Sequence, residues 1–259
     1  MNVLIFILVI IACVGYVIYV FKQADSKSLD ISYMKTSSLS DAISVLDEMS
    51  NSDTNYRHYA EIKVTAHGNN SFPAPFSGQS VIYYSNQCFS VTQEKQVTYD
   101  KENKRHERIV KRESELSSDN SSEPIFIKDN SIESPILLDL QSFGSKSDLT
   151  AGCDRFENKD SQFSRSHFSN YRSGADFLGF RLKERILREG QPLYILGELY
   201  RMGNDLYFGY AHQANKSSMV SVKSEDQILN DVKGEKTKAL ITAAGVAIVA
   251  FFFFFSKQF

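Results

Sequence analysis

Two long apolar blocks, one near each end of the chain, constrain the fold most. Residues 3–21 hold no charged side chain over nineteen positions, and residues 239–255 hold none over seventeen. As helices these blocks would be about 28 and 25 Å long, close to the hydrocarbon thickness of a bilayer. We therefore expect transmembrane helices over residues 1–21 and 239–255, with a short tail at residues 256–259.

A cleaved signal peptide is the alternative for the first block. Such a peptide has a positive n-region, a shorter apolar run and a small-residue cleavage site. Here only two residues precede a longer run. Tyr19 and Phe21, followed by Lys22, suit the headgroup level where a helix leaves a membrane. These features favour an uncleaved anchor.

The second block carries small side chains on one helical face, at Ala239, Ala243 and Ala247. A face of this kind allows a second helix to approach closely. That helix would be the first block, or the same block of another copy in a homo-oligomer. The alternative, that the three alanines face lipid, is equally compatible with the sequence.

Lysines flank the two blocks mainly on the side of the intervening domain, at Lys22, Lys27, Lys35, Lys233, Lys236 and Lys238. The opposite side has only the α-amino group and Lys257. The positive-inside rule therefore predicts a two-pass integral membrane protein with its domain in the cytoplasm. In a prokaryote this membrane would be the inner membrane.

The composition argues against two further classes of protein. The formal net charge is -2, whereas a nucleic-acid binder usually has a strongly basic balance, so we expect no nucleic-acid partner. The three cysteines are sparse and form no Cys-x-x-Cys pair, which is neither a disulfide framework nor a zinc site. A Cys88–Cys153 bridge stays open, although two separate thiols are favoured.

The middle of the chain predicts a mainly β domain. Residues 22–58 form a membrane-proximal segment, in which Ser38 or Ser40 caps a short helix ending near Met49. Over residues 59–232 the period becomes two, with short strands at 59–66, 81–84, 124–128, 136–139, 180–187 and 192–200 among others. We expect a compact β-barrel or sandwich-like domain with short helices. Residues 143–176 are expected to be an irregular excursion.

A charged turn joins two long strands expected at residues 88–99 and 107–115. It holds six Lys or Arg against three Glu between Lys101 and Glu113. Contact with anionic lipid headgroups is one interpretation. Because the acids are interleaved with the bases, we favour a solvated hairpin tip whose charges protect a sheet edge.

Chemistry-bearing patterns are absent from the sequence. The histidines stand singly at His58, His67, His106, His167 and His212, without a second ligand at metal spacing. No nucleophile elbow, HExxH or P-loop occurs. We therefore expect no catalytic residue, no cofactor-binding residue, no metal ligand and no cofactor.

Four strings, taken in order, resemble one family. They are Ala74-Pro-Phe-Ser-Gly78 followed by Val81-Ile-Tyr-Tyr84; Pro124-Ile-Phe-Ile-Lys-Asp129; Gly179-Phe-Arg-Leu-Lys-Glu184 with Glu189-Gly190 and Leu193-Tyr-Ile-Leu-Gly-Glu198; and Val220-Ser221 with Ser224-Glu225. They are similar to motifs of the GIDE domain, also called the beside-a-membrane domain, over roughly residues 56–232. The resemblance implies structural or partner-binding roles for Pro75, Ser77, Gly78, Tyr83, Tyr84, Phe126, Asp129, Glu184, Gly190, Gly197, Glu198, Ser221 and Glu225.

The family includes mitochondrial E3 ubiquitin ligases of the MULAN/MAPL type, which carry a C-terminal RING. Here Ser256-Lys-Gln-Phe259 follows the second block, so the chain resembles a short member without a RING. Asn130-Ser131 replaces the family's glycine, and the chain has no tryptophan. We expect a non-catalytic scaffold that binds lipid or an unknown membrane-proximal protein. The alternative implied by the family is ubiquitin-ligase activity, and family analogy puts the domain on the non-cytoplasmic side.

Overall fold

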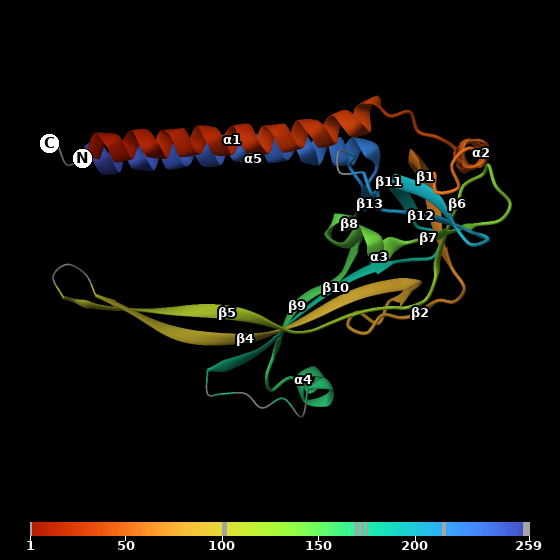
Figure 1. Cartoon of the computed structure of the whole chain (residues 1–259). Helices are drawn as coiled ribbons and strands as arrows, with labels where there is room; N and C mark the ends of the chain where they lie inside the picture. The colour runs from red at the N-terminus through yellow and green to blue at the C-terminus, as the bar shows by residue number, and fades with distance from the viewer. Residues whose placement is uncertain are drawn as a thin grey trace. The chain divides into compact units, whose positions relative to one another are not determined.

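A computed structural model of the chain describes residues 2–99, 103–168, 171, 174, 176–213 and 216–255 (Figure 1). Lys257 and the tail expected at residues 256–259 lie outside the described residues. The helices are α1 (Asn2–Tyr33), α2 (Leu39–Ser50), α3 (Leu140–Phe143), α4 (Gln162–His167) and α5 (Glu225–Phe255), with a 3₁₀ turn η1 at Gly144–Lys146.

The predicted mainly β fold is confirmed. The strands are β1 (His58–Gly68), β2 (Phe72–Pro73), β3 (Ser80–Val81), β4 (Tyr83–Tyr99), β5 (Arg105–Asn120), β6 (Ile125–Lys128), β7 (Ile136–Leu138), β8 (Ser147–Asp148), β9 (Thr150–Asn158), β10 (Phe177–Leu187), β11 (Pro192–Met202), β12 (Asp205–Gly209) and β13 (Met219–Ser221). Strands predicted at residues 59–66, 180–187 and 192–200 appear within β1, β10 and β11.

The larger sheet closes on itself. Its strand order is β1-β6-β7-β12-β11-β13-β8, and β1 also pairs with β11. Strands β1, β6, β7, β12 and β11 therefore form a closed five-stranded barrel, which leaves no free edge among these strands. A second sheet has the order β5-β4-β10-β9, and β2 pairs with β3.

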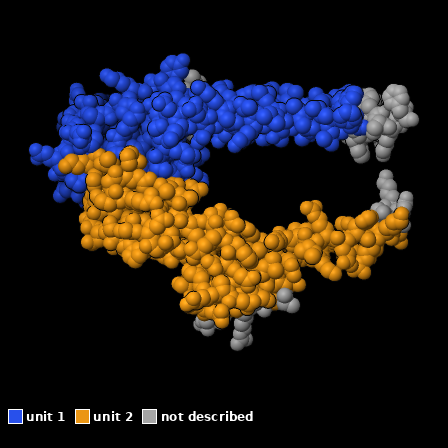
Figure 2. All heavy atoms as spheres, turned by 180° about the vertical axis from the view of Figure 1, so that it is seen from behind, with its two compact units in different colours: residues 1–64, 129–148, 193–259 blue, residues 65–128, 149–192 orange. Residues whose placement is uncertain are grey.

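The chain divides into two compact units, coloured separately in Figure 2. Unit 1 comprises residues 1–64, 129–148 and 193–259, and unit 2 comprises residues 65–128 and 149–192. The four-stranded sheet belongs to unit 2. Its core packs Cys88, Phe177, Phe180 and Leu182 against the partly buried Phe76, Cys153, Phe163 and Phe168.

Helix α2 of unit 1 follows the sequence prediction closely. The Ser38 side chain accepts a hydrogen bond from Asp41 N at 3.1 Å, as an N-cap residue does. Leu39, Ala42 and Leu46 are buried along one face, so tertiary packing stabilises a helix that is marginal by itself.

Two expectations about regular structure are wrong. The segment 143–176 contains β9, a nine-residue strand that pairs with β10, because alternate residues such as Thr150 and Phe156 meet the neighbouring strand despite a polar composition. The helix that begins at Glu225, inside the domain expected at residues 59–232, does not end with that domain but continues to Phe255. Lysine, glutamate and alanine after Gly234 are good helix formers and supply no stop signal.

The two long helices of unit 1 run side by side and antiparallel (Figure 1). The Phe6 and Phe251 rings contact each other edge to face at 6.4 Å, and Lys236 forms an ion pair with Asp25. Among the described residues one segment, Phe6–Asp25, is long and apolar enough to cross a membrane, with a mean hydropathy of 2.1. The second expected span, at residues 239–255, stays a prediction.

Candidate functional site

The family-motif turn between β2 and β3 is held by one buried acid, Glu184 of β10. Phe76 N donates to Glu184 Oε1 at 2.8 Å, and Ser77 N donates to Oε2 at 3.0 Å. Glu184 is 1% exposed. Hydrogen bonds from backbone N–H groups offset the cost of burying a carboxylate. Pro75 and Gly78 lie on the same turn, where Gly78 has a φ of +68° that favours glycine.

A glycine that sequence reasoning missed makes room for this clamp. A Cβ on Gly152 of β9 would lie 3.0 Å from Glu184 Oε2, 3.4 Å from Ser77 Oγ and 2.8 Å from Ile186 Cγ2. Only a residue without a side chain leaves the carboxylate in place. The signal that was available is a glycine inside an alternating segment, which marks a close approach in a strand.

The tyrosines that open β4 lie beside the same turn but make separate contacts. Tyr83 is buried, which raises the pKa of its hydroxyl. Tyr84 is half-buried and donates to Asp119 Oδ2 at 3.0 Å; burial first, and then Asp119, raise its pKa. Its ring packs edge to face on Phe72 at 6.0 Å. These contacts hold the two tyrosine side chains in place within the fold.

A second motif turn of unit 2 contains Gly190, whose φ is +70°. The neighbouring Glu189 accepts from Gly68 N at 2.9 Å and lies 2.6 Å from His67 Nδ1. His67 Nε2 lies 2.9 Å from Thr65 Oγ1, which completes a chain of hydroxyl, imidazole and carboxylate. This order of groups is that of a nucleophile, a base and its orienting acid.

The hydroxyl of this chain is directed away from the imidazole. Thr65 Oγ1 donates its single hydroxyl proton to the Lys128 carbonyl at 3.1 Å, so this proton is not directed at His67. A general base activates a hydroxyl by accepting its proton, and here the proton is bound by a backbone carbonyl. The trio therefore ties the end of β1 to the Gly190 turn instead of activating a nucleophile.

Asp129 of unit 1 caps helix α2. Its carboxylate accepts from Leu39 N at 2.8 Å and from Ser131 N at 2.8 Å, while Ser131 Oγ accepts from Ser40 N at 2.9 Å. Burial raises the pKa of Asp129, but the hydrogen bonds from Leu39 and Ser131 outweigh burial and lower the pKa below its ordinary value. Asn130-Ser131, where the family has glycine, thus supplies a second cap.

Phe126, another motif residue, lies half-buried in β6 of unit 2.

Gly197 and Glu198 bring β11 close to β12 in unit 1. A Cβ on Gly197 would lie 2.4 Å from the Gly209 carbonyl oxygen, so a side chain does not fit there.

Glu198 is 1% exposed, and its Oε2 has no hydrogen-bond partner among the described residues. His212 Nδ1 lies 3.5 Å from Oε2, and the Arg57 guanidinium lies 3.2 Å from the same nitrogen.

Tyr200, two residues along β11, extends this polar cluster. Its hydroxyl donates to Asp139 Oδ2 at 3.2 Å, and burial followed by the Asp139 charge raises the pKa of Tyr200 to about 12. The Arg57 guanidinium stacks over its ring at 4.1 Å. A tyrosine with a raised pKa stays protonated and donates, which is a structural role.

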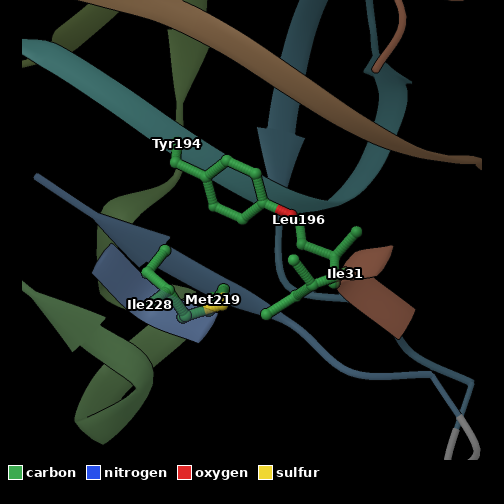
Figure 3. Close-up of a cluster of buried hydrophobic side chains, with 5 residues drawn as sticks. All are labelled: Ile31, Tyr194, Leu196, Met219 and Ile228. Atoms are coloured by element: carbon green, nitrogen blue, oxygen red, sulfur yellow. The ribbon is translucent and has the colours of Figure 1, made fainter. Parts of the chain in front are cut away.

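A buried apolar cluster packs the C-terminal end of α1 and the N-terminal end of α5 against the sheet. It consists of Ile31, Tyr194, Leu196, Met219 and Ile228 (Figure 3). Glu61, 1% exposed on β1, accepts from Thr36 Oγ1 at 2.6 Å, whereas its Oε2 has no partner among the described residues. Burial, and then the Glu61 charge, raise the pKa of Tyr194 well above its usual range.

The last motif residues complete this attachment of α5. Ser221 is buried in β13, and its hydroxyl oxygen accepts from Lys223 N at 3.1 Å. Ser224 and Gln227 form reciprocal caps at the start of α5. Glu225, in the first turn of α5, pairs with Lys63 at 2.8 Å. The motif residues therefore hold turns and element ends at several separate places instead of meeting at one site.

The alanine face of α5 lies on the less exposed side of that helix. Ala239 is buried and Ala243 and Ala247 are half-buried, while the residues between Ala243 and Ala247 are exposed. Because α5 packs along α1 in unit 1, close approach to α1 accounts for this pattern.

Within the described residues, no group of three His, Cys, Asp or Glu side chains is placed to hold a metal ion. Cys88 and Cys153 are free thiols, and burial raises the pKa of Cys88 to about 11. Burial is also the leading reason why the pKa of Cys153 is raised. A thiol with a raised pKa is a poor nucleophile at neutral pH.

The fold and these contacts define a mainly β protein built on a five-stranded barrel, with buried acids that hold turns and a long helix at each end. The chain belongs to the GIDE family, which is described as E3 ubiquitin ligase: the match extends over residues 94–254, more than half of the sequence. No curated protein and no solved structure matches the chain.

Proposed function

We propose that the chain is a two-pass membrane protein whose β-rich part is a non-catalytic, membrane-proximal binding module. The observation that carries this proposal is the outer surface of the α1/α5 pair. It exposes large apolar side chains, such as Ile11 at 61%, Ile241 at 68% and Val249 at 69%. An apolar band of this kind is unfavourable in water, whereas lipid tails suit it.

The pairing of the two helices supports a second span. Helix α5 runs antiparallel to α1, and Phe251 contacts Phe6, which lies at the start of the apolar segment of α1. A helix that packs along most of a membrane span occupies the same layer of the bilayer. The ion pair between Lys236 and Asp25 lies near the other end of the apolar segments, where charged groups reach headgroups and water.

Extraction and topology mapping test the anchoring. The full chain should stay in the membrane pellet in alkaline carbonate. With a tag at each end, protease treatment of sealed vesicles should leave both tags on one side and the domain on the other. Release by carbonate, or tags on opposite sides, would contradict the two-pass proposal.

A substitution in the second helix separates one span from two. Ile248 is 57% exposed on α5, so Ile248→Arg puts a charge among lipid tails, at a cost of about 3 kcal/mol for a central position. We expect the C-terminal tag to move to the domain side while α1 keeps the chain in the membrane. Ile248→Leu is the matched control and should leave both tags in place.

The binding role of the domain is supported by its motif residues, which hold turns and, among the described residues, include no nucleophile beside an activating base. Lysine flanks favour the cytoplasmic side, and family analogy favours the opposite side; the same protease experiment decides between them. Crosslinking in native membranes should capture a membrane-proximal protein partner or a second copy. A domain that captures neither, and that contacts no lipid, would contradict a scaffold role.

Ubiquitin-ligase activity is the second candidate, because the family match carries that description. A transfer assay with activating enzyme, conjugating enzymes and ubiquitin tests it on the purified full chain. Ubiquitin chains that depend on this protein would favour the ligase over the scaffold.

A further inference from the structure

The hairpin formed by β4 and β5 extends beyond the sheet that supports it. Strand β10 pairs with β4 only as far as Thr92, whereas β4 and β5 stay paired out to Tyr99 and Arg105. Residues 93–99 and 105–112, called the basic ribbon below, are therefore a two-stranded structure with both faces exposed. An isolated two-stranded hairpin is marginally stable in water, so a ribbon of this length benefits from a surface to pack on.

One face of the basic ribbon combines apolar and basic side chains. Residues paired across an antiparallel ladder point to the same side, so Tyr99 and Arg105, Val97 and Glu107, Lys95 and Ile109, and Gln93 and Lys111 share this face. Tyr99 is 64% exposed and Ile109 is 62% exposed. Val97 lies between Lys95 and Tyr99 on this face of β4. It is the diagonal neighbour of Ile109, which pairs with Lys95.

The acidic residues of the ribbon are used within it. Glu107 pairs with Lys95 at 3.1 Å and with Arg105 at 2.6 Å, and Glu94 pairs with Arg112 at 2.7 Å. On the face with Val97, Tyr99 and Ile109, three basic side chains, Lys95, Arg105 and Lys111, stand against the single acid Glu107, whereas Arg108 and Arg112 point to the opposite face. The interleaving seen in the sequence therefore leaves an excess of two positive charges on this apolar face.

We infer that the Val97–Tyr99–Ile109 face of the basic ribbon docks on the headgroup layer of a bilayer that contains anionic lipid. Tyrosine is enriched at membrane interfaces, and lysine and arginine beside it pair with anionic headgroups. An interface of this kind takes apolar, aromatic and basic groups together, which is the composition of this face. A protein partner would need an acidic apolar surface of matching shape, and nothing else in the ribbon specifies one.

This inference rests on the proposed function, because the anchor supplies the bilayer. A tether in the same chain replaces a second binding partner in solution by a high local concentration of lipid. Weak docking by a few side chains is then sufficient. Each basic residue near an anionic surface strengthens docking about fivefold, so removing two should weaken it roughly thirtyfold.

The test uses the full chain in nanodiscs and a single tryptophan. Because the chain has no tryptophan, Tyr99→Trp gives one reporter on the ribbon. Nanodiscs of phosphatidylcholine alone are compared with nanodiscs containing phosphatidylserine. We expect blue-shifted emission and quenching by brominated lipid in the anionic discs only, and both should weaken at high salt.

Matched variants separate docking from general exposure. In the Tyr99→Trp background, the double change Arg105→Gln with Lys111→Gln removes two charges from the docking face and should lower the docked fraction of the reporter. The double change Arg105→Lys with Lys111→Arg keeps both charges and should leave the docked fraction unchanged. Phe156→Trp, introduced instead of Tyr99→Trp, reports from β9, where the side chain is 45% exposed, and should show no lipid dependence.

The outcomes also distinguish this inference from the anchoring. A ribbon reporter whose signal is identical in both lipids, in a chain that resists carbonate extraction, overturns the docking and leaves the anchor. A chain that washes off membranes overturns the anchor itself. Shielding of the ribbon reporter that needs native membranes and not anionic lipid would identify a protein partner and overturn the lipid assignment.

Discussion

Two buried glutamates on successive strands, Glu184 of β10 and Glu198 of β11, are bound in opposite ways. Each is 1% exposed. Glu184 accepts a backbone N–H on each oxygen, from Phe76 at 2.8 Å and Ser77 at 3.0 Å. Glu198 Oε2 accepts none among the described residues, and the His212 imidazole lies 3.5 Å from it.

The two carboxylates have different roles, each in its own unit. The N–H groups that Glu184 binds lie in a tight turn without sheet partners, so the acid satisfies donors that would otherwise be unpaired. Glu198 lies in a paired strand whose backbone is already satisfied, and its charge is balanced only loosely. The first is a clamp that the turn needs, while the second is a buried charge that the fold tolerates.

Removal of the clamp should have the largest effect. Glu184→Ala leaves two half-buried backbone donors without an acceptor, so we expect the free energy of unfolding to fall by about 3 kcal/mol. Denaturant unfolding of the full chain in detergent measures the loss. Hydrogen exchange at Phe76 and Ser77 should accelerate most, because these amides lose their acceptors.

Glu189→Ala is the control for that loss, since Glu189 is an exposed acid that also accepts a backbone N–H. It should cost about 1 kcal/mol or less because water replaces the carboxylate. Equal losses for Glu184→Ala and Glu189→Ala would contradict the clamp.

Neutral isosteres of the two glutamates should differ in stability. Glu184→Gln turns an NH₂ group toward one of two backbone donors and should cost about 2 kcal/mol. Glu198→Gln removes a poorly balanced buried charge and should stay within about 0.5 kcal/mol of the parent. Thermal unfolding of both variants in one detergent gives the difference, and a reversed order would show that Glu198 carries the more important contacts.

The glycine beside the clamp should matter somewhat less. Gly152→Ala puts a methyl group 2.8 Å from Ile186 Cγ2 and 3.0 Å from Glu184 Oε2. Both are side-chain atoms that are able to shift, so we expect a loss of about 1.5 kcal/mol, within the range for overpacking. Combined with Glu184→Ala the loss should be less than additive, because the crowded oxygen is gone. Full additivity would mean that Gly152 serves Ile186 alone.

The sequence predicted the elements whose patterns are local. The period of two marked β1, β10 and β11, and a serine cap, Ser38 or Ser40, marked the start of α2, because alternation and capping depend on neighbouring residues. It missed β9, whose polar residues pair with β10, because strand pairing across the sheet is not written in a local period. It also ended the β domain at residue 232 and started a separate helix at residue 239, whereas α5 runs through both positions without a residue that stops it.

The candidate site was predicted only in part. Family resemblance identified Glu184, Gly197 and Asp129, but not what each contacts. Those contacts join residues far apart in the chain, as Asp129 does with Leu39. Glu61 and His212 gave no signal, because a single acid in a strand or a single histidine in a loop has no distinguishing spacing.

The cap on α2 should show a smaller effect than the Glu184 clamp and its glycine, and a defined pH dependence. Asp129→Asn weakens the bonds to Leu39 N and Ser131 N, and we expect a loss of about 1 kcal/mol at neutral pH. The folded pKa of Asp129 is lowered, because its hydrogen bonds outweigh the effect of burial. Its contribution is therefore fully present above the ordinary value of 3.8 and is lost as the pH falls through the lower folded pKa. Urea unfolding of parent and variant between neutral and acidic pH should show a difference that shrinks in acid. A difference that is constant with pH would mean that the Asp129 charge does not hold the helix.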